Sequence, residues 1–382
     1  MTATSPSPGS GYDPLASAGT TTSGPEPRIR LASPVTGEEE VEAVRQVLES
    51  GILTNGPWTR SFEALMAERH GTEHAVAFAN GTVALSAMYL ACGIGPGDEV
   101  IVPSLTFVGT ATSVLHVGAT PVFADILPDT FNLDPHDVAR RITPRTKAIV
   151  PVHYGGQAAE LQAFRDLADE AGVVLLEDAA QAHGATYLDR PVGSWGEAGM
   201  FSFTPTKNIT TGEGSVVTTT DGDLAHTMRL LRNHGMSKPY HHEILGWNWR
   251  LSEIHAAIGC RQLDRLDGIL ATKRANATVM AGLLGAIDGV TPPAAPADRD
   301  HPYMIYTVQM DPLRRDAAVD ALTAAGIESR LYFPPVHRQP IFAHLPDTDL
   351  AVTEDVFSRL LSLPFHSRLT PADLADIAGV LA

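Results

Sequence analysis

Five short apolar segments in the first half of the chain constrain the fold more than any other feature. They read HAVAFAN (74–80), EVIVPS (99–104), TPVFADI (120–126), KAIVPVHY (147–154) and GVVLLEDAA (172–180). Between them lie four helix-like segments, at 82–91, 106–117, 134–142 and 158–171. Apolar strands that alternate with amphipathic helices predict an α/β fold with a mostly parallel central sheet covered on both faces.

The carboxyl ends of these strands are where a ligand is expected, because sheets of this kind bind ligands beyond that edge. This rule directs attention to Asn80–Gly81–Thr82, Ser104, His153–Tyr154 and Asp178. The architecture alone does not name a function, since one fold carries many chemistries.

The rest of the chain suggests a second, smaller α/β unit. A helical pattern runs from Ser252 to Ile287, and it is followed by strand-like MIYTVQM (304–310) and by helices near 315–325 and 371–381. Residues 1–27 are mostly Ser, Thr, Gly and Pro, which predicts a disordered tail. We therefore expect a large domain over 28–265, whose first helix carries Val41, Val44 and Leu48 on one face, and a small C-terminal domain over 266–382.

Composition narrows the possible partners. The formal net charge of −17 disfavours nucleic acid and acidic membrane surfaces, although a local pocket can still hold a small anion. The cysteines, Cys92 and Cys260, are too few for a disulfide framework or a cysteine metal cluster. No apolar run is long enough to cross a bilayer, and no secretory signal is recognisable. We expect a cytoplasmic protein with neither a nucleic-acid nor a membrane partner.

Asn80, Gly81 and Thr82 stand where the first strand turns into a helix. A helix N-terminus offers unpaired N–H groups and a partial positive charge, which suit a phosphate. The same residues also suit an ordinary N-cap. The sequence leaves both interpretations open.

Asp178 ends the last of the five apolar segments. A carboxylate at that edge could bind a metal, act as a base or hold a protonated heterocycle. His183 is the only further metal ligand nearby, so we expect no metal site. Gln181 could present its amide to the same place, or could serve on the surface or as a cap.

Lys207 follows Ser202 by five residues in FSFTPTKNITTGEG and is the only lysine between Lys147 and Lys238. Lysine is usually a surface residue, but beside an apolar wall its pKa falls and its amine becomes nucleophilic. A phosphate-binding helix start, an aspartate at a strand end, a serine and a lysine are the parts that a pyridoxal phosphate site requires.

Several longer motifs carry a resemblance to a known family. NGTVAL, PSLTFVGTATSVLHVGATPVFADI, EDAAQAHGA, FSFTPTKNITTGEG and GWNWRLSEIHAAIG occur in the order typical of the DegT/DnrJ/EryC1/StrS family. The chain resembles this family from about Arg28 to its C-terminus. The resemblance implies a fold-type I pyridoxal phosphate aminotransferase of amino-sugar biosynthesis (antibiotic or cell-surface glycan). Such an enzyme moves an amino group from an amino acid, here expected to be L-glutamate, to a keto group of a nucleotide-linked sugar.

The resemblance also implies roles for the matching residues around the cofactor ring. Lys207 is the Schiff-base lysine and the proton shuttle, and Asp178 pairs with the pyridinium nitrogen. Gln181 lies near the phenolic oxygen, and Phe107 stacks on the ring.

The phosphate and substrate contacts are implied in the same way. Gly81, Thr82 and Ser202 hold the phosphate. Asn248 reaches the phosphate of the neighbouring subunit's cofactor, which implies a homodimer with shared active sites, although a local-turn role is also open. In SRLYFPPVHRQP, substrate contacts are candidate roles beside packing for three residues: Arg330, Tyr332 and His337.

Two departures from the family pattern bear on the site. Ser215 stands where relatives usually carry a glycine, so we expect a local loop adjustment. Trp247 and Trp249 replace commoner tyrosines, which affects the pocket shape near the substrate. Sugar dehydratases of the family replace the lysine with histidine, so Lys207 favours transamination.

Three other functions remain open from the sequence. The acceptor could be a cyclitol ketone, or the reaction could be an aromatising dehydration of an aminoshikimate-type precursor. From another class, the protein could be a non-catalytic, cofactor-binding regulator. The combination of Lys207, Asp178, Gln181 and Ser202 argues against the regulator, because binding alone has little need of a pyridinium partner.

Overall fold

The computed structural model describes residues 26–346 and 348–382. The predicted disordered tail therefore lies outside the described residues up to position 25. The α-helices are α1 (Glu38–Ser50), α2 (Pro57–His70), α3 (Gly81–Ala91), α4 (Gly109–His116), α5 (Pro135–Arg141), α6 (Leu161–Ala171), α7 (Gly222–Arg232), α8 (Glu253–Gly285), α9 (Pro312–Ala324), α10 (Ala351–Arg359) and α11 (Pro371–Leu381). Single 3-10 turns are found at Tyr154–Gly156, Val336–Arg338 and Pro340–Phe342.

The strands form one large sheet and three small ones. Those of the large sheet are β1 (His74–Phe78), β2 (Glu99–Pro103), β3 (Thr120–Ala124), β4 (Thr146–Ile149), β5 (Val174–Asp178), β8 (Ala198–Ser202) and β9 (Ser215–Thr219). The others are β6 (Thr186–Tyr187), β7 (Arg190–Pro191), β10 (Met236–Lys238), β11 (His241–His242), β12 (Val290–Thr291), β13 (Arg299–Asp300), β14 (Tyr306–Met310) and β15 (Leu360–Leu363).

The seven-stranded sheet has the order β1-β9-β8-β5-β4-β2-β3. Strands β8, β5, β4, β2 and β3 pair in parallel, whereas β9 pairs antiparallel with both β8 and β1. The five predicted strands correspond to β1–β5, and the four predicted helices between them to α3–α6. The α/β architecture with a mostly parallel sheet is therefore confirmed.

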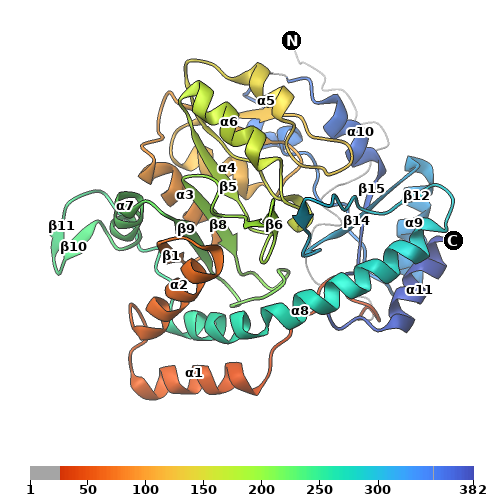
Figure 1. The fold of residues 1–382 in the computed structure, drawn as a ribbon, viewed down its shortest axis with the longest axis horizontal. Coiled ribbons are helices and arrows are strands. Elements are labelled where there is room, and N and C mark those ends of the chain that lie inside the picture. Colours follow the sequence, from red (N-terminus) through yellow and green to blue (C-terminus); the bar gives the residue numbers. More distant parts are fainter. Residues whose placement is uncertain (1–25, 347) are drawn as a thin grey trace, which may run out of the picture.

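Both faces of the sheet are covered by helices (Figure 1). Side chains alternate along a strand, so neighbouring residues enter different cores. In β2, Val100 and Val102 pack in the core that contains α3, α4 and α7, whereas Ile101 packs with α5 and α6. Every residue of β2 is buried. This double burial explains why the strands read as continuous apolar runs instead of alternating ones.

The long helix α8 connects the two parts of the chain. It has 33 residues and extends from the region below the large sheet to the C-terminal elements (Figure 1). There the β12-β14-β15 sheet, α9 and α11 form a separate core, which Ile29 also joins through a β-bridge to Ile327. The proposed domain boundary after residue 265 falls inside α8, and the division into two domains stays a prediction.

Helix α1 turns its predicted apolar face outward. Val41 and Leu48 are 54% and 57% exposed, and the side that faces α8 carries Glu40, Ala43 and Val47. Glu40 is held there by Arg265, whose Nε donates to Oε1 at 2.8 Å. Val41 and Leu48 on the predicted apolar face are therefore about half exposed, whereas Val44 is partly buried.

None of the helices in the described residues is both long enough and apolar enough to span a membrane.

Candidate active site

A cavity of about 360 Å³ lies at the carboxyl edge of the large sheet. Its wall includes residues that end or follow β1, β2, β5 and β8, as the strand-end rule predicts. Eight residues that the sequence predicted as cofactor or substrate contacts line it: Gly81, Thr82, Phe107, Asp178, Gln181, Ser202, Lys207 and Tyr332. The first seven had been predicted to touch a cofactor, and Tyr332 to touch a substrate.

The N-terminus of α3 opens into this cavity. Asn80 is the N-cap, and its Oδ1 accepts a hydrogen bond of 3.1 Å from the backbone N–H of Val83. Gly81 and Thr82 supply the first N–H groups of the helix and line the cavity, as does Ser202 at the end of β8. The two interpretations of this turn are therefore compatible, because one residue caps the helix while its neighbours leave N–H groups free for an anion.

Gly81 is a direct test of this anion site. A Cβ added there would meet Met200 Sδ and Cε at 3.5 Å and Ser202 Cβ at 3.7 Å, which are ordinary contacts. Folding therefore does not require glycine. We expect Gly81→Ala to change the free energy of unfolding by less than about 1 kcal/mol. The added methyl group enters the cavity, so the dissociation constant of pyridoxal phosphate should rise about tenfold or more. Chemical denaturation and absorbance titration measure the two effects separately, and equal losses in both would contradict the assignment.

Asp178 ends β5 and is almost fully buried in the cavity wall. Its Oδ2 accepts from the Thr110 hydroxyl at 2.7 Å, and its Oδ1 accepts from the Ala180 N–H at 3.1 Å. Burial raises the pKa of this carboxyl, whereas the Thr110 hydrogen bond and the nearby Lys207 charge lower it. A cationic group inside the cavity would therefore stabilise the negative charge of this buried carboxylate.

Thr110 is a further residue of the candidate site, and the sequence reasoning missed it. It belongs to the first turn of α4, and its hydroxyl also lies 2.9 Å from that of Thr106. The two threonines fix the orientation of the Asp178 carboxylate. A buried carboxylate requires hydrogen-bond donors, and this requirement could have directed attention to a hydroxyl near Asp178.

Lys207 lies in the loop between β8 and β9 and faces the same cavity. Its backbone N–H donates to Thr204 O at 3.0 Å. The Lys207 side chain is partly exposed to solvent because it lines the cavity, and the rest of it packs against protein atoms. Burial lowers the pKa of its amine to about 8, while the Asp178 charge partly opposes this shift. The interpretation of Lys207 as an ordinary surface lysine is therefore wrong.

The lowered pKa of Lys207 predicts a pH profile for cofactor capture. Only the neutral amine attacks an aldehyde, and with a pKa of about 8 roughly a tenth of the amine is neutral at pH 7. The capture rate should rise about tenfold per pH unit below pH 8 and level off above it. Stopped-flow absorbance of the cofactor-free protein mixed with pyridoxal phosphate measures this rate. A rate that kept rising to pH 10 would indicate an ordinary lysine.

Two further wall residues suit a flat, polar ring. Gln181 Oε1 accepts from the Gly155 N–H at 2.7 Å, which leaves the amide N–H groups of Gln181 as donors toward a ligand. Phe107 is 57% exposed and presents its ring to the cavity. An exposed aromatic face at the mouth of a cavity is a stacking platform.

The two departures from the family pattern have structural explanations. The Ser215 hydroxyl donates to the carbonyl of Asn80 at 2.8 Å, so it ties the start of β9 to the N-cap of α3. Trp247 and Trp249 stack on each other, with ring centroids 4.5 Å apart and an interplanar angle of 3°. Alternate residues of an extended segment point the same way, so the intervening Asn248 faces the other side.

Three predicted residues do not line this chain's cavity. Asn248 is exposed and forms a β-bridge with Asn233. Arg330 pairs with Ser362 in another bridge, and its guanidinium lies 3.7 Å from a Glu328 carboxylate oxygen. His337 is engaged on both sides, with Nδ1 2.7 Å from Ser104 Oγ and Nε2 2.9 Å from Glu354 Oε1.

The C-terminal part closes one side of the cavity. Met304, Ile305 and Phe333 line it together with Tyr332. These apolar residues gave no signal in the sequence, because only the folded chain brings them next to β5 and α3.

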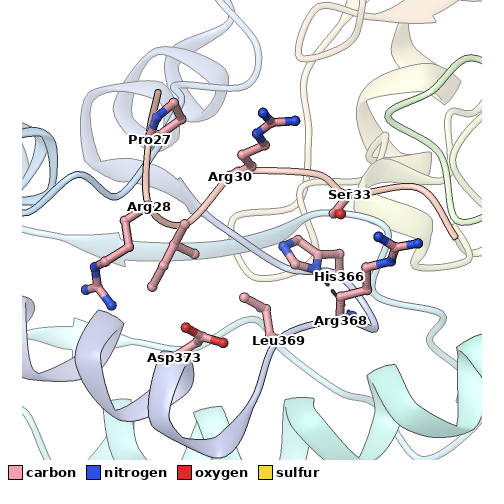
Figure 2. A pocket seen from close by; sticks show the side chains of 9 residues that line it. Pro27, Arg28, Arg30, Ser33, His366, Arg368, Leu369 and Asp373 are labelled. Atoms are coloured by element: carbon pink, nitrogen blue, oxygen red, sulfur yellow. Dashed lines mark hydrogen bonds between the residues drawn. The ribbon is translucent and has the colours of Figure 1, made fainter. Parts of the chain in front are cut away.

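A second pocket of about 220 Å³ lies between the beginning of the described chain and the loop that precedes α11. Figure 2 shows Arg28, Arg30 and Arg368 around it, together with His366 and Asp373. None of the residues predicted for the cofactor or substrate lines this pocket. The chemistry of the candidate site is therefore concentrated in the cavity at the sheet edge.

Comparison with known proteins agrees with this geometry. The model of the DegT/DnrJ/EryC1/StrS aminotransferase family matches residues 34–382, which is nearly the whole chain. The chain belongs to the DegT/DnrJ/EryC1/StrS aminotransferase family. It is an aminotransferase, and the resemblance inferred from the motifs is confirmed.

Relatives in the DegT/DnrJ/EryC1/StrS family carry several specificities. GDP-perosamine synthase of Caulobacter vibrioides is 42% identical over 362 residues, covering 93% of this chain and 98% of that protein. UDP-N-acetyl-3-dehydro-alpha-D-glucosamine 3-aminotransferase of Acidithiobacillus ferrooxidans is 40% identical, with 90% and 93% covered. The crystal structure of 3-amino-5-hydroxybenzoic acid synthase superimposes with a TM-score of 0.87 at 34% identity, with 94% and 98% covered.

Proposed function

We propose that this aminotransferase uses pyridoxal phosphate to transfer an amino group from L-glutamate to a keto group of a nucleotide-linked sugar. The observation that carries the proposal is the meeting of Lys207, Asp178 and the α3 N-terminus in one cavity. The nucleotide-sugar specificity rests on the relatives named for GDP- and UDP-linked sugars, at 42% and 40% identity.

The residues fit pyridoxal phosphate at each end. The α3 N-terminus at Gly81 and Thr82, together with the Ser202 hydroxyl, suits the phosphate. The phosphate can approach the backbone closely because Gly81 has no side chain. Asp178 suits the protonated ring nitrogen, and Phe107 suits a ring face. When bound, the cofactor supplies an electron sink that makes loss of a proton from the substrate carbon feasible.

The protein groups then have separable tasks. Lys207 would carry the substrate proton at its Nζ, and its pKa of about 8 leaves a neutral base available near neutral pH. Asp178 would hold the protonated ring nitrogen of the cofactor, and Thr110 keeps the Asp178 carboxylate oriented. Gln181 offers amide N–H groups to an oxygen on the ring. Met304, Ile305 and Phe333 restrict water on the C-terminal side of the cavity.

The test of the proposed function uses the protein loaded with pyridoxal phosphate and L-glutamate labelled with ¹⁵N. It is mixed separately with a GDP-linked 4-keto sugar, a UDP-linked 3-keto sugar, a cyclitol ketone and 5-amino-5-deoxy-3-dehydroshikimate. Mass spectrometry should detect ¹⁵N in a nucleotide sugar. If ¹⁵N appeared only in the cyclitol, the acceptor would be a cyclitol ketone instead of a nucleotide-linked sugar. An aromatised product without ¹⁵N would support the dehydratase. A cofactor-loaded protein that reacted neither with L-glutamate nor with any of the four substrates would support the non-catalytic regulator.

We further propose a homodimer with shared sites. The hairpin β10–β11 projects from the body of the molecule (Figure 1), and its surroundings expose Tyr240 at 94% and Leu245 at 77%. The outer face of α1 adds exposed Val41 and Leu48. Exposed apolar side chains on projecting elements support an interface, and Asn248, which lies close to this hairpin in sequence, would then serve the partner's phosphate.

Subunit complementation tests the Asn248 assignment. Lys207→Ala and Asn248→Ala are each expected to be strongly impaired, and the two proteins are unfolded, mixed in equal amounts and refolded together. If Asn248 serves the partner, half of the dimers are hybrids with one intact site, so about a quarter of wild-type activity returns. If it serves its own chain, every site of a hybrid is damaged and no activity returns.

A further inference from the structure

Lys273 is a buried lysine that the proposed chemistry does not use. The chain has four lysines, of which Lys147 and Lys238 are exposed and Lys207 borders the cavity. Lys273 lies in the middle of α8 and is 3% exposed. A buried ammonium group is costly unless its surroundings repay the lost hydration, so its retention calls for a specific role.

The surroundings of Lys273 contain no carboxylate partner among the described residues. Its Nζ donates to Asn208 Oδ1 at 2.7 Å, and the ring of Phe365 lies 5.6 Å away. The histidines nearby, His301 and His366, are kept neutral by burial, with pKa values of about 3 and about 4. Burial lowers the pKa of Lys273 itself to about 7. Within residues 26–346 and 348–382, the Asn208 side chain is therefore the only hydrogen-bond acceptor found for this amine.

Asn208 connects three parts of the molecule. It directly follows Lys207 in the chain, and it is buried. Its Oδ1 accepts from Lys273 of α8, while its Nδ2 donates to the carbonyl of Pro302 at 3.1 Å. Two residues later, Met304 begins the stretch of the C-terminal part that lines the cavity. A single side chain thus joins the Lys207 loop, the long helix and the far wall of the site.

We propose that Lys273 and Asn208 form a clamp that positions Lys207 against the C-terminal wall of the active site. Both are positioning residues, since neither lines the cavity. The proposal rests on the proposed function only in taking Lys207 as the reacting amine. Its geometric part, the fixing of the loop between β8 and β9, is independent of any cofactor.

The clamp acts at a point where the loop has few other restraints on Lys207. The backbone N–H of Lys207 bonds only within the loop, to Thr204, and no hydrogen bond of its Nζ is found in the described part of the chain. Further along, Gln262 of α8 accepts from the Thr210 N–H at 3.1 Å. Of these two attachments to α8, the Asn208 side chain is the one closer to Lys207 in sequence. A displacement of about 1 Å at a reacting group can cost about a hundredfold in rate.

The experiment compares Lys273→Met, Asn208→Ala, the double variant and the surface control Lys147→Met. The first readout is amide hydrogen exchange of the full-length protein, with and without pyridoxal phosphate, in peptides that cover residues 204–210 and 300–305. The second is the rate constant with which L-glutamate changes the visible absorbance of the loaded protein. Cofactor binding is measured for each variant so that loading is equal.

Each single variant should exchange about tenfold faster in both peptides and react with glutamate at least about tenfold more slowly, and the control should match wild type. Because both side chains belong to one hydrogen bond, the double variant should be no worse than the poorer single variant. Unchanged exchange, or single effects that multiply in the double variant, would overturn the clamp. If wild-type protein ignored glutamate, the proposed function would fail, and the exchange data would still decide the clamp.

Discussion

Lys207→Ala should lose amine transfer by at least about a thousandfold, because one substitution removes both the nucleophile and the proton carrier. The cavity remains, since Lys207 contributes no hydrogen bond from its side chain within the described residues, and the phosphate contacts at α3 are untouched. Pyridoxal phosphate should therefore still bind, but with the absorbance of a free aldehyde. The measurement is the spectrum before and after L-glutamate, followed by the rate of labelled product formation.

Lys238→Ala provides the matched control for this variant. Lys238 is exposed on β10 and lies outside the cavity, so the substitution should leave the spectrum and the reaction with glutamate unchanged. If Lys207→Ala kept more than about a tenth of wild-type activity, Lys207 could not be the reacting amine, because no single catalytic group of this kind is so dispensable.

Asp178→Asn should lower the rate of amine transfer by about a hundredfold or more, because a preorganised charge opposite a developing charge is worth that much. The amide keeps the size of the carboxyl and can still accept from Thr110, so the cavity should retain its shape. What disappears is the negative charge that would keep the ring nitrogen protonated. The binding of pyridoxal phosphate should weaken much less than the rate falls.

A graded control separates charge from position at Asp178. Thr110→Val removes the hydroxyl that donates 2.7 Å to Asp178 Oδ2 and leaves the carboxylate in place. A hydrogen bond from a neutral donor to a charged group is worth about 1.5–3 kcal/mol. The rate of amine transfer should therefore fall by about ten- to a hundredfold, which is less than for Asp178→Asn. An Asp178→Asn protein as fast as wild type would show that the ring nitrogen has no need of this carboxylate.

The central sheet was largely predictable from the sequence because its strands are buried on both faces. β1–β5 are apolar enough to be recognised one by one, and α8 was found through its long helical pattern. β9 was not predicted, since SVVTT is short and partly polar and owes its place to pairing with β1 and β8. The orientation of α1 also escaped prediction, because buried Glu40 reverses the usual relation between polarity and burial.

The candidate site was predictable where its residues follow strand ends. Gly81, Asp178 and Ser202 each stand at or just after the carboxyl end of a large-sheet strand, so topology alone brings them together. Site residues that are placed by contacts with residues distant in the sequence were missed. Thr110 and the Asn208–Lys273 pair depend on side-chain placement across elements, and no local pattern reports it.

The most direct test of the account is to find which lysine carries the cofactor. Protein loaded with pyridoxal phosphate is reduced with borohydride, digested and mapped by mass spectrometry, and the four lysines fall at well-separated positions: 147, 207, 238 and 273. The account predicts a phosphopyridoxyl group on Lys207 alone, with occupancy close to one per chain. A label on Lys273 or on the two surface lysines, or no label at all, would contradict it.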